Sequence, residues 1–424
     1  MNRKMLVAGS LLALTGCAGN VDAPGAGGTD DPEELETAPE PLRAGDVIAY
    51  AAETSHPYAG GWKQAITSPG ATFVRVHFND FSLAKGDYVT VSSPDGAQSF
   101  RYEDRGPNGD GDVWAFAIDG ETAIVELHSS TGGGHGFSIA DIGHGTIAIA
   151  PDPVTSGEAT PGSVALARRP GGGTPDIVCA TEGREPIVCH PELDVQQRPV
   201  ARLLFARGTG MYLCTGWLIA TEDKYRTTLI TNNHCISTQE ETNSLETRFG
   251  YQRTACESSA AAAVAAGEGL VGGSLLKTNS RTRTRSRGGL DYTLIRLPGN
   301  PQTTWGVLTP TTKAPRVGNP INFIQHPAGR PKEIGFWRDD AHTLRCQVDA
   351  LDQTYSGTLS GSQIGYSCDS EGGSSGSPII DAGTGRVVGL HHLADVAWLS
   401  CRNGGTEMSA ICADAGALIS CVNN

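Results

Sequence analysis

Residues 372–378 read Gly-Gly-Ser-Ser-Gly-Ser-Pro, and an apolar pair, Ile379 and Ile380, follows at once. Glycine tolerates positive φ angles and a close approach of the backbone, so such a turn can direct successive N–H groups at one point. It can also hold a serine hydroxyl beside them. Acyl transfer needs both features, a nucleophile and an oxyanion hole. Because a Gly/Ser run is also typical of an ordinary turn, the rest of the chain must decide.

Two upstream segments contain the partners that a nucleophilic serine needs. The first is a His-Cys pair at the end of an apolar strand, with the histidine at His234. The second places Asp291 at the start of an apolar run, where a carboxylate is costly unless it is paired. The chain order His234, Asp291, Ser375 is that of base, orienting acid and nucleophile in one class of serine peptidase. The N–H groups of Gly373 and Ser375 would then form the oxyanion hole.

The same turn also fits Gly-x-Ser-x-Gly, which would make Ser374 the nucleophile of an α/β-hydrolase. That fold needs an acid and a histidine after the serine. Asp381, His391 and His392 do follow, but within 18 residues, which leaves no room for further βα units. The chain also lacks alternating helical segments, so we favour Ser375 as the nucleophile.

Composition restricts the class of protein. The chain has 424 residues, enough for two or three domains. Its net charge of −14 argues against a nucleic-acid partner. Its 55 glycines and low aromatic content fit turn-rich β structure better than helical bundles. We therefore expect an all-β protein.

The first 17 residues have the composition of an export signal. Arg3 and Lys4 precede a short apolar run, residues 5–14, which is too short to span a membrane. The run ends in Leu-Thr-Gly-Cys at residues 14–17, which resembles the lipobox of bacterial lipoproteins. We expect export and a lipid anchor on Cys17, in the periplasm or at the cell surface, with release after processing as a further option. The alternative is an ordinary signal peptide with an incidental cysteine.

Composition also divides the remainder of the chain. Residues 18–43 are rich in Gly, Ala, Pro, Asp and Glu and predict a flexible tether. Residues 44–150 contain no cysteine and predict a small antiparallel β-sandwich. Residues 151–175 are a Pro- and Gly-rich linker, and a cysteine-bearing domain occupies residues 176–424.

The sandwich is predicted from short runs that alternate apolar and polar residues, at 73–78, 88–91, 113–118 and 122–127. Within the same region, Asn108, Asp110 and Asp112 alternate with glycines. Their side-chain oxygens could bind calcium. A plain hairpin loop explains them as well, and turn chemistry favours the loop.

The cysteines indicate an oxidising compartment. Apart from Cys17, ten of the 11 cysteines lie between residues 179 and 421. An even set in an exported protein predicts up to five disulfides. The sequence has no Cys-x-x-Cys pair, so we expect no zinc site, and no motif indicates another metal or a cofactor.

Taken together, these segments resemble the chymotrypsin-like peptidases, and residues 176–424 are similar to bacterial lysyl endopeptidases. The resemblance is carried by Cys-Thr-Gly-Trp-Leu-Ile at 214–219, His-Cys at 234–235, Asp-Tyr-Thr-Leu-Ile at 291–295, Gly-Ser-Ser-Gly-Ser-Pro at 373–378, and shorter matches at 176–179, 249–252, 324–327 and 387–391. It implies a double β-barrel with the site between the barrels. It also implies that residues 44–150 are a propeptide-like domain, which would help folding or inhibit the enzyme and later be removed.

The resemblance further implies a disulfide pattern. Three pairs follow from it, Cys179–Cys401, Cys189–Cys256 and Cys214–Cys235, and the remaining cysteines could pair as Cys346–Cys368 and Cys412–Cys421. One residue differs from the digestive enzymes of the chymotrypsin-like class: they have an aspartate where this chain has Ser374. A new N-terminus cannot form a salt bridge there, so activation would require removal or displacement of the first domain.

Substrate preference is less constrained. His391 and His392 lie on the segment that would border the substrate pocket, where they would contact a carboxylate or an aromatic group, or be ordinary strand histidines. Glu407 lies where a pocket-floor acid would select Lys or Arg, although it could equally be a loop charge. We expect an exported serine endopeptidase that acts on proteins or peptides, after basic residues. The alternatives are a Glu-specific endopeptidase and a non-catalytic surface-binding lipoprotein with a protease fold.

Overall fold

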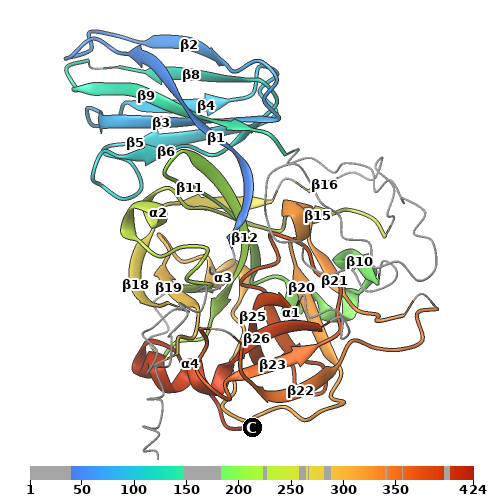
Figure 1. The fold of residues 1–424 in the computed structure, drawn as a ribbon. Helices are drawn as coiled ribbons and strands as arrows, with labels where there is room; N and C mark the ends of the chain where they lie inside the picture. Colours follow the sequence, from blue (N-terminus) through green and yellow to red (C-terminus); the bar gives the residue numbers. More distant parts are fainter. Residues whose placement is uncertain are drawn as a thin grey trace, which may run out of the picture. The chain divides into compact units, whose positions relative to one another are not determined.

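The computed structural model describes residues 40–130, 132–147, 183–222, 227–256, 264–265, 267–280, 288–339, 341–355, 357–395 and 402–424 (Figure 1). The expected signal peptide with Cys17, most of the tether, the linker, and the pair Cys179–Cys401 lie outside these residues. Within the described ranges, no helix is long and apolar enough to cross a membrane.

The first domain is a sandwich of two antiparallel sheets. One contains β1 (Leu42–Glu53), β9 (Gly136–Gly145), β3 (Phe73–Ser82), β6 (Val113–Trp114) and β7 (Ile118–Asp119). The other contains β2 (Trp62–Thr67), β8 (Thr122–His128), β4 (Tyr88–Ser92) and β5 (Ser99–Glu103). Along β8, buried and half-buried residues alternate, as the sequence predicts for a strand with one face in the core. The expected β-sandwich is confirmed, and β1 starts within the segment predicted as tether.

The run at residues 113–118 was expected to form one strand, and this prediction is wrong. The structure has two short strands, β6 and β7, with Ala115 to Ala117 between them. Ala115 still donates its N–H to the carbonyl of Val76 (2.8 Å). The N–H of Ala117, however, donates to Oε2 of Glu246 in the second domain (2.9 Å), so a contact outside the sheet diverts the backbone from β3.

The loop with alternating acids makes protein contacts with its oxygens. Asn108 Oδ1 accepts from the N–H of Gly273 (3.1 Å), and Asp110 Oδ2 accepts from Nδ2 of Asn243 (3.2 Å). Asp112 Oδ1 instead lies 2.6 Å from Nε2 of His77. The three side chains therefore point to different neighbours, as expected for a structural loop rather than a calcium cage.

The second domain contains two barrel-like antiparallel sheets. The first has strands β11 (Val200–Arg207), β12 (Gly210–Ile219), β13 (Thr228–Thr231), β14 (Glu246–Phe249), β17 (Glu268–Val271), β18 (Ser274–Asn279) and β19 (Tyr292–Arg296). The second has β10 (Arg184–Pro186), β20 (Ile321–Gln325), β21 (Glu333–Gly335), β22 (Val348–Gln353), β23 (Gln363–Tyr366), β24 (Pro378–Asp381), β25 (Val387–Asp395) and β26 (Arg402–Glu407). The expected all-β fold with a double barrel is confirmed.

Short elements complete this domain. They are α1 (Asp194–Gln197), α2 (Gln239–Asn243), α3 (Gln302–Trp305), α4 (Met408–Ala415) and the two-stranded pair β15 (Gln252–Arg253) and β16 (Val264–Ala265). One apolar cluster includes Trp217 and Leu294 from the first barrel and Ile324 and Leu390 from the second. This shared core fixes the junction at which the candidate site lies.

Four of the expected disulfides are formed in the structure: Cys189–Cys256, Cys214–Cys235, Cys346–Cys368 and Cys412–Cys421. The Cys214–Cys235 bridge joins β12 to the loop that follows β13. It therefore fixes the position of the histidine that precedes Cys235.

Strand β1 links the two domains. It pairs with β9 along most of its length and with β12 at its beginning, so one sheet continues from the sandwich into the first barrel. The buried Glu246 also joins the domains. It accepts from the N–H of Ala117 in the first domain (2.9 Å), and from Nη2 of Arg202 (3.1 Å) and Nε of Arg248 (2.9 Å) in the second. The two domains belong to one compact unit.

Candidate active site

His234 and Asp291 form a hydrogen-bonded pair at the junction. Nδ1 of His234 lies 2.8 Å from Oδ2 of Asp291, and the N–H of His234 donates to Oδ1 (2.9 Å). Pairing of β13 with β19, with Thr231 opposite Thr293, brings the two loops together. Both oxygens of the carboxylate are thus used to hold one residue, and the position and orientation of the imidazole are fixed.

Asp291 is completely buried. Burial opposes ionisation, but the charge and hydrogen bonds of His234, with a smaller contribution from the charge of His392, lower the pKa of Asp291 to about 2. The carboxylate is therefore ionised at neutral pH. A buried anion beside Nδ1 stabilises a positive charge on the imidazole, which is what a general base needs after it accepts a proton.

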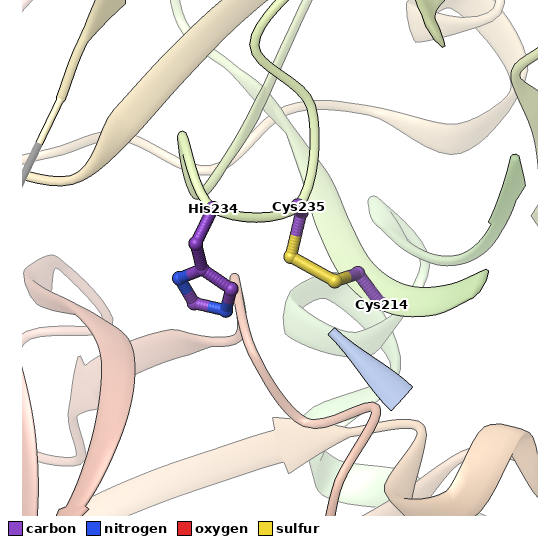
Figure 2. A group of neighbouring side chains, drawn as sticks. All are labelled: Cys214, His234 and Cys235. Carbon is purple, nitrogen blue, oxygen red and sulfur yellow. A yellow bond between two sulfur atoms is a disulfide. The ribbon is translucent and has the colours of Figure 1, made fainter. Parts of the chain in front are cut away.

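The other imidazole nitrogen of His234, Nε2, has no hydrogen-bond partner in the part of the chain that the structure describes. Figure 2 shows the ring beside the Cys214–Cys235 bridge. Although ligand atoms of these three residues lie within 4.8 Å of one another, both cysteines are oxidised and offer no thiolate for a metal. The free nitrogen is consequently available for acid–base chemistry.

Arg207 supports the histidine loop from behind. Its Nη2 donates to the carbonyl oxygens of His234 (2.9 Å) and Cys235 (2.6 Å), and its Nε lies 2.5 Å from Oε1 of Glu241. Glu241 also closes a capping box with Thr238 at the start of α2. Arg207 is not predictable from the sequence, because no local pattern connects it with a loop 27 residues away.

The turn around Ser375 depends on its glycines. Gly373 and Gly376 have φ angles of +98° and +89°. A Cβ on Gly376 would lie 2.1 Å from the carbonyl oxygen of Thr215, and one on Gly373 would lie 3.0 Å from that of His326. Only glycine fits at position 376, since the contact there is with rigid backbone.

A hydrogen bond fixes the orientation of the peptide between Gly372 and Gly373. The carbonyl of Gly372 accepts from the N–H of Ala328 (2.7 Å), and in a trans peptide the next N–H points the opposite way. Thr215 also holds the turn, because its N–H donates to the carbonyl of Ser375 (2.8 Å) and its Oγ1 to that of Gly373 (2.8 Å). The N–H groups of Gly373 and Ser375 have no hydrogen-bond partner among the described residues.

Ser374 and Ser375 have different surroundings. Ser374 is completely buried, and its hydroxyl donates to Oε1 of Gln325 (2.6 Å) and accepts from the N–H of Glu371 (3.2 Å). Ser375 is only partly buried. The hydroxyl of Ser374 anchors the turn to the second barrel and cannot reach a substrate, which argues against the α/β-hydrolase alternative together with the antiparallel fold.

Glu371 fixes the beginning of the turn. It forms ion pairs with Arg184 (2.9 Å) and with Arg330. Burial raises its pKa, but these two guanidinium groups outweigh that effect and lower it to about 2. The sequence provides no signal for this cluster, because Arg184 and Arg330 come from distant segments with no shared motif.

The two expected pocket histidines are both buried on β25. Nδ1 of His391 lies 2.5 Å from the hydroxyl of Tyr366, while Nε2 of His392 lies 2.5 Å from Oε1 of Gln363. Nδ1 of His392 lies 3.6 Å from Oδ2 of Asp291. His392 is therefore a neighbour of the Asp291 carboxylate. His391 also holds the serine turn through its backbone, because its carbonyl accepts from the N–H of Gly376 (2.9 Å).

Glu407 ends β26 and is 7% exposed. Burial raises its pKa. Its Oε2 accepts from the hydroxyl of Ser409 (3.1 Å), and among the described residues no cation forms an ion pair with it.

A second buried acid, Asp369, lies six residues before Ser375 and was not predicted from the sequence. Its Oδ2 accepts from the N–H of Gly183 (2.6 Å).

Residues 174–393 match the family described as "Lysyl endopeptidase, C-terminal domain". The chain belongs to the lysyl endopeptidase family. The match covers the histidine loop, Asp291 and the serine turn. It ends before Glu407, so the family assignment does not extend to that residue.

The chain is also similar to individual proteins. The chain is 30% identical over 334 residues to "Secreted RxLR effector protein 73" from Plasmopara viticola, covering 77% of this chain and 76% of that protein. Among solved structures, a Glu endopeptidase is 17% identical and covers 56% of this chain and 96% of its own, with a TM-score of 0.38. The active form of the Rv3671c protease from M. tuberculosis is 13% identical and covers 61% and 96%, with a TM-score of 0.40.

Proposed function

We propose that this chain is an exported serine endopeptidase that cleaves peptide bonds through His234, Asp291 and Ser375. The observation that carries the proposal is the arrangement at the barrel junction. A buried, ionised Asp291 fixes His234, and within the described part of the chain Nε2 of His234 and two N–H groups of the serine turn have no hydrogen-bond partner.

The reaction would proceed through an acyl-enzyme. Oγ of Ser375 attacks the carbonyl carbon of the substrate while Nε2 of His234 takes its proton. Asp291 stabilises the imidazolium, and the N–H groups of Gly373 and Ser375 donate to the developing oxyanion. The leaving amine receives the proton from His234 as the peptide bond breaks. Water then attacks the ester, again with His234 as base, and releases the acid product and free Ser375.

We further propose that the enzyme cleaves after Lys or Arg. A buried carboxylate such as Glu407 is costly without a counterion, and a basic substrate side chain would supply one. Glu specificity would require a charged histidine. Burial lowers the pKa of His391 well below its ordinary value, so this residue is neutral at neutral pH and cannot pair with a substrate carboxylate.

Export and anchoring are also proposals. The four disulfides suit an oxidising compartment, and the relative from Plasmopara viticola is described as secreted. Cys17 would carry the lipid, and the first domain would act as a propeptide. These features would place a peptidase outside the cytoplasm, with protein or peptide substrates.

A peptide-library digest tests the activity and the specificity together. The processed chain should cut after Lys or Arg, while Ser375→Ala, with the same disulfides, should not cut. Cuts after Glu would contradict the assigned specificity. If Ser375→Ala leaves every measured function unchanged, the non-catalytic binding protein becomes the better account.

A further inference from the structure

The beginning of β1 occupies an edge of β12 beside the candidate site. The residues of β1 that pair with β12, here named the β1 start, are Leu42 to Asp46. Leu42 lies opposite Leu213 and Asp46 opposite Gly210, in antiparallel register. Cys214 is the next residue of β12 after Leu213.

The same edge of β12 then meets the catalytic elements. Two residues beyond Leu213, the N–H of Thr215 donates to the carbonyl of Ser375 (2.8 Å), and further on Trp217 pairs with Ile230 of β13. Along one edge, β12 therefore contacts the β1 start, then the serine turn, then the strand that leads to His234. Figure 2 shows the beginning of β1, in pale blue, near Cys214.

Leu42 also lies beside the serine turn. A Cβ on Gly372 would lie 3.3 Å from Cδ1 of Leu42, so this side chain covers the residue before the oxyanion donor Gly373. The Cys214–Cys235 bridge lies on the same side, next to the His234 ring (Figure 2). Because His234 must deliver its proton to the departing amine, this side of the site faces the leaving-group half of a substrate.

We propose that the β1 start fills the leaving-group side of the substrate cleft, so the attached first domain competes with extended peptides for the edge of β12. The proposal rests on the proposed peptidase function. An extended peptide binds by adding an antiparallel strand to an open edge, and one edge accepts one strand. With the first domain attached, the N–H groups of Gly373 and Ser375 have no partner among the described residues, so we take the competition to be steric. Substrates with no residues beyond the scissile bond avoid it.

Several contacts keep the β1 start in position. Nη2 of Arg43 donates to the carbonyl of Thr209 (3.3 Å), and the N–H of Val47 donates to the same carbonyl (2.9 Å). The fully buried Arg75 donates from Nη1 to the carbonyl of Leu204 (3.4 Å). Because the strand is tethered to its site, its effective concentration is on the order of millimolar or higher, well above a typical substrate concentration.

The test compares two substrates with the same acyl residue, chosen from the library digest. One is a 4-nitroanilide, which has no amino acid after the scissile bond, and the other is a quenched peptide with four residues after it. Leu42→Gly removes the side chain over Gly372 and loosens the strand. We expect kcat/KM for the peptide to rise about tenfold and that for the nitroanilide to stay within about twofold. The matched control Ile48→Gly lies in the part of β1 that pairs with β9 and should change neither.

A second measurement uses the unaltered chain, in case Leu42→Gly does not fold. A free-amine tetrapeptide that mimics the leaving half should not inhibit nitroanilide hydrolysis at millimolar concentration, because its site is filled. Competitive inhibition in the unaltered chain, or equal changes for both substrates in Leu42→Gly, would overturn the proposal. Failure of the peptidase function would differ from both results, because no chain would hydrolyse the nitroanilide.

Discussion

Nδ1 of His392 lies 3.6 Å from Oδ2 of Asp291, the same oxygen that contacts Nδ1 of His234 at 2.8 Å. The triad carboxylate therefore lies between two imidazoles. Gln363 holds the far side of the His392 ring through Nε2 (2.5 Å). We therefore expect His392 to be a positioning residue for Asp291.

His392→Ala should reduce kcat more than it changes KM. Loss of the second imidazole leaves Asp291 less firmly placed, and we expect kcat to fall about tenfold, or ~1.4 kcal/mol in the activation barrier. His392→Gln, which retains a donor, should recover part of the loss. Steady-state kinetics with the nitroanilide measure both parameters, with the exposed His342→Ala as control. An unchanged kcat in His392→Ala would exclude this role.

Glu371 should make the fold sensitive to acid. Its pKa in the folded chain is about 2, below its ordinary value of 4.5, so its stabilising contribution is complete above pH 4.5 and disappears as the pH falls toward 2. The shift corresponds to roughly 3 kcal/mol. Glu371→Gln should lower the melting temperature at pH 7 and flatten its fall between pH 4.5 and 2. Glu103→Gln, at an exposed position, should follow the unaltered curve, and an identical curve for Glu371→Gln would refute the assignment.

Gly376→Ala should abolish peptidase activity and the reaction of Ser375 with a phosphonofluoridate. The new Cβ would lie 2.1 Å from the carbonyl of Thr215, at a φ angle of +89°, so the serine turn must move. Backbone strain of this kind costs about 1–3 kcal/mol before the clash is added. Gly385→Ala is the matched control, because its φ is also positive, at +68°, but its Cβ would meet only Nε2 of Gln196 at 3.6 Å. Full activity in Gly376→Ala would contradict the geometry of the turn.

The two serines of the turn should respond differently to alanine. Ser375→Ala should remove activity, whereas Ser374→Ala should keep a substantial part of it. Ser374→Ala leaves the buried Oε1 of Gln325 without its donor, which should lower the free energy of unfolding by about 1–3 kcal/mol. Denaturant titration and nitroanilide kinetics on both variants separate the effects. The reverse pattern would identify Ser374 as the nucleophile.

The sequence was most informative where a local pattern carries chemistry. The serine turn, His234 and Asp291 each stand beside an apolar strand, and their order alone indicated their roles. The sandwich was also predictable, because strands such as β8 alternate strictly. In each case the information lies within a few consecutive residues.

The rest depends on contacts between distant segments. The register of β25 shifts between His391 and Leu393, so the direction of His392 toward Asp291 does not follow from simple strand alternation. Glu371 is held by two arginines from other loops. The β1 start pairs with a strand of another domain across a register shift between Arg43 and Gly45, which no periodicity in either segment reveals.

The most direct test of the central claim is labelling of the chain with a phosphonofluoridate, followed by mapping of the modified residue by mass spectrometry. We predict one adduct, on Ser375, in the folded chain, and no adduct in denatured protein or in Ser375→Ala. Correctly disulfide-bonded, folded chain that stays unlabelled, or that carries its adduct on Ser374, would contradict it.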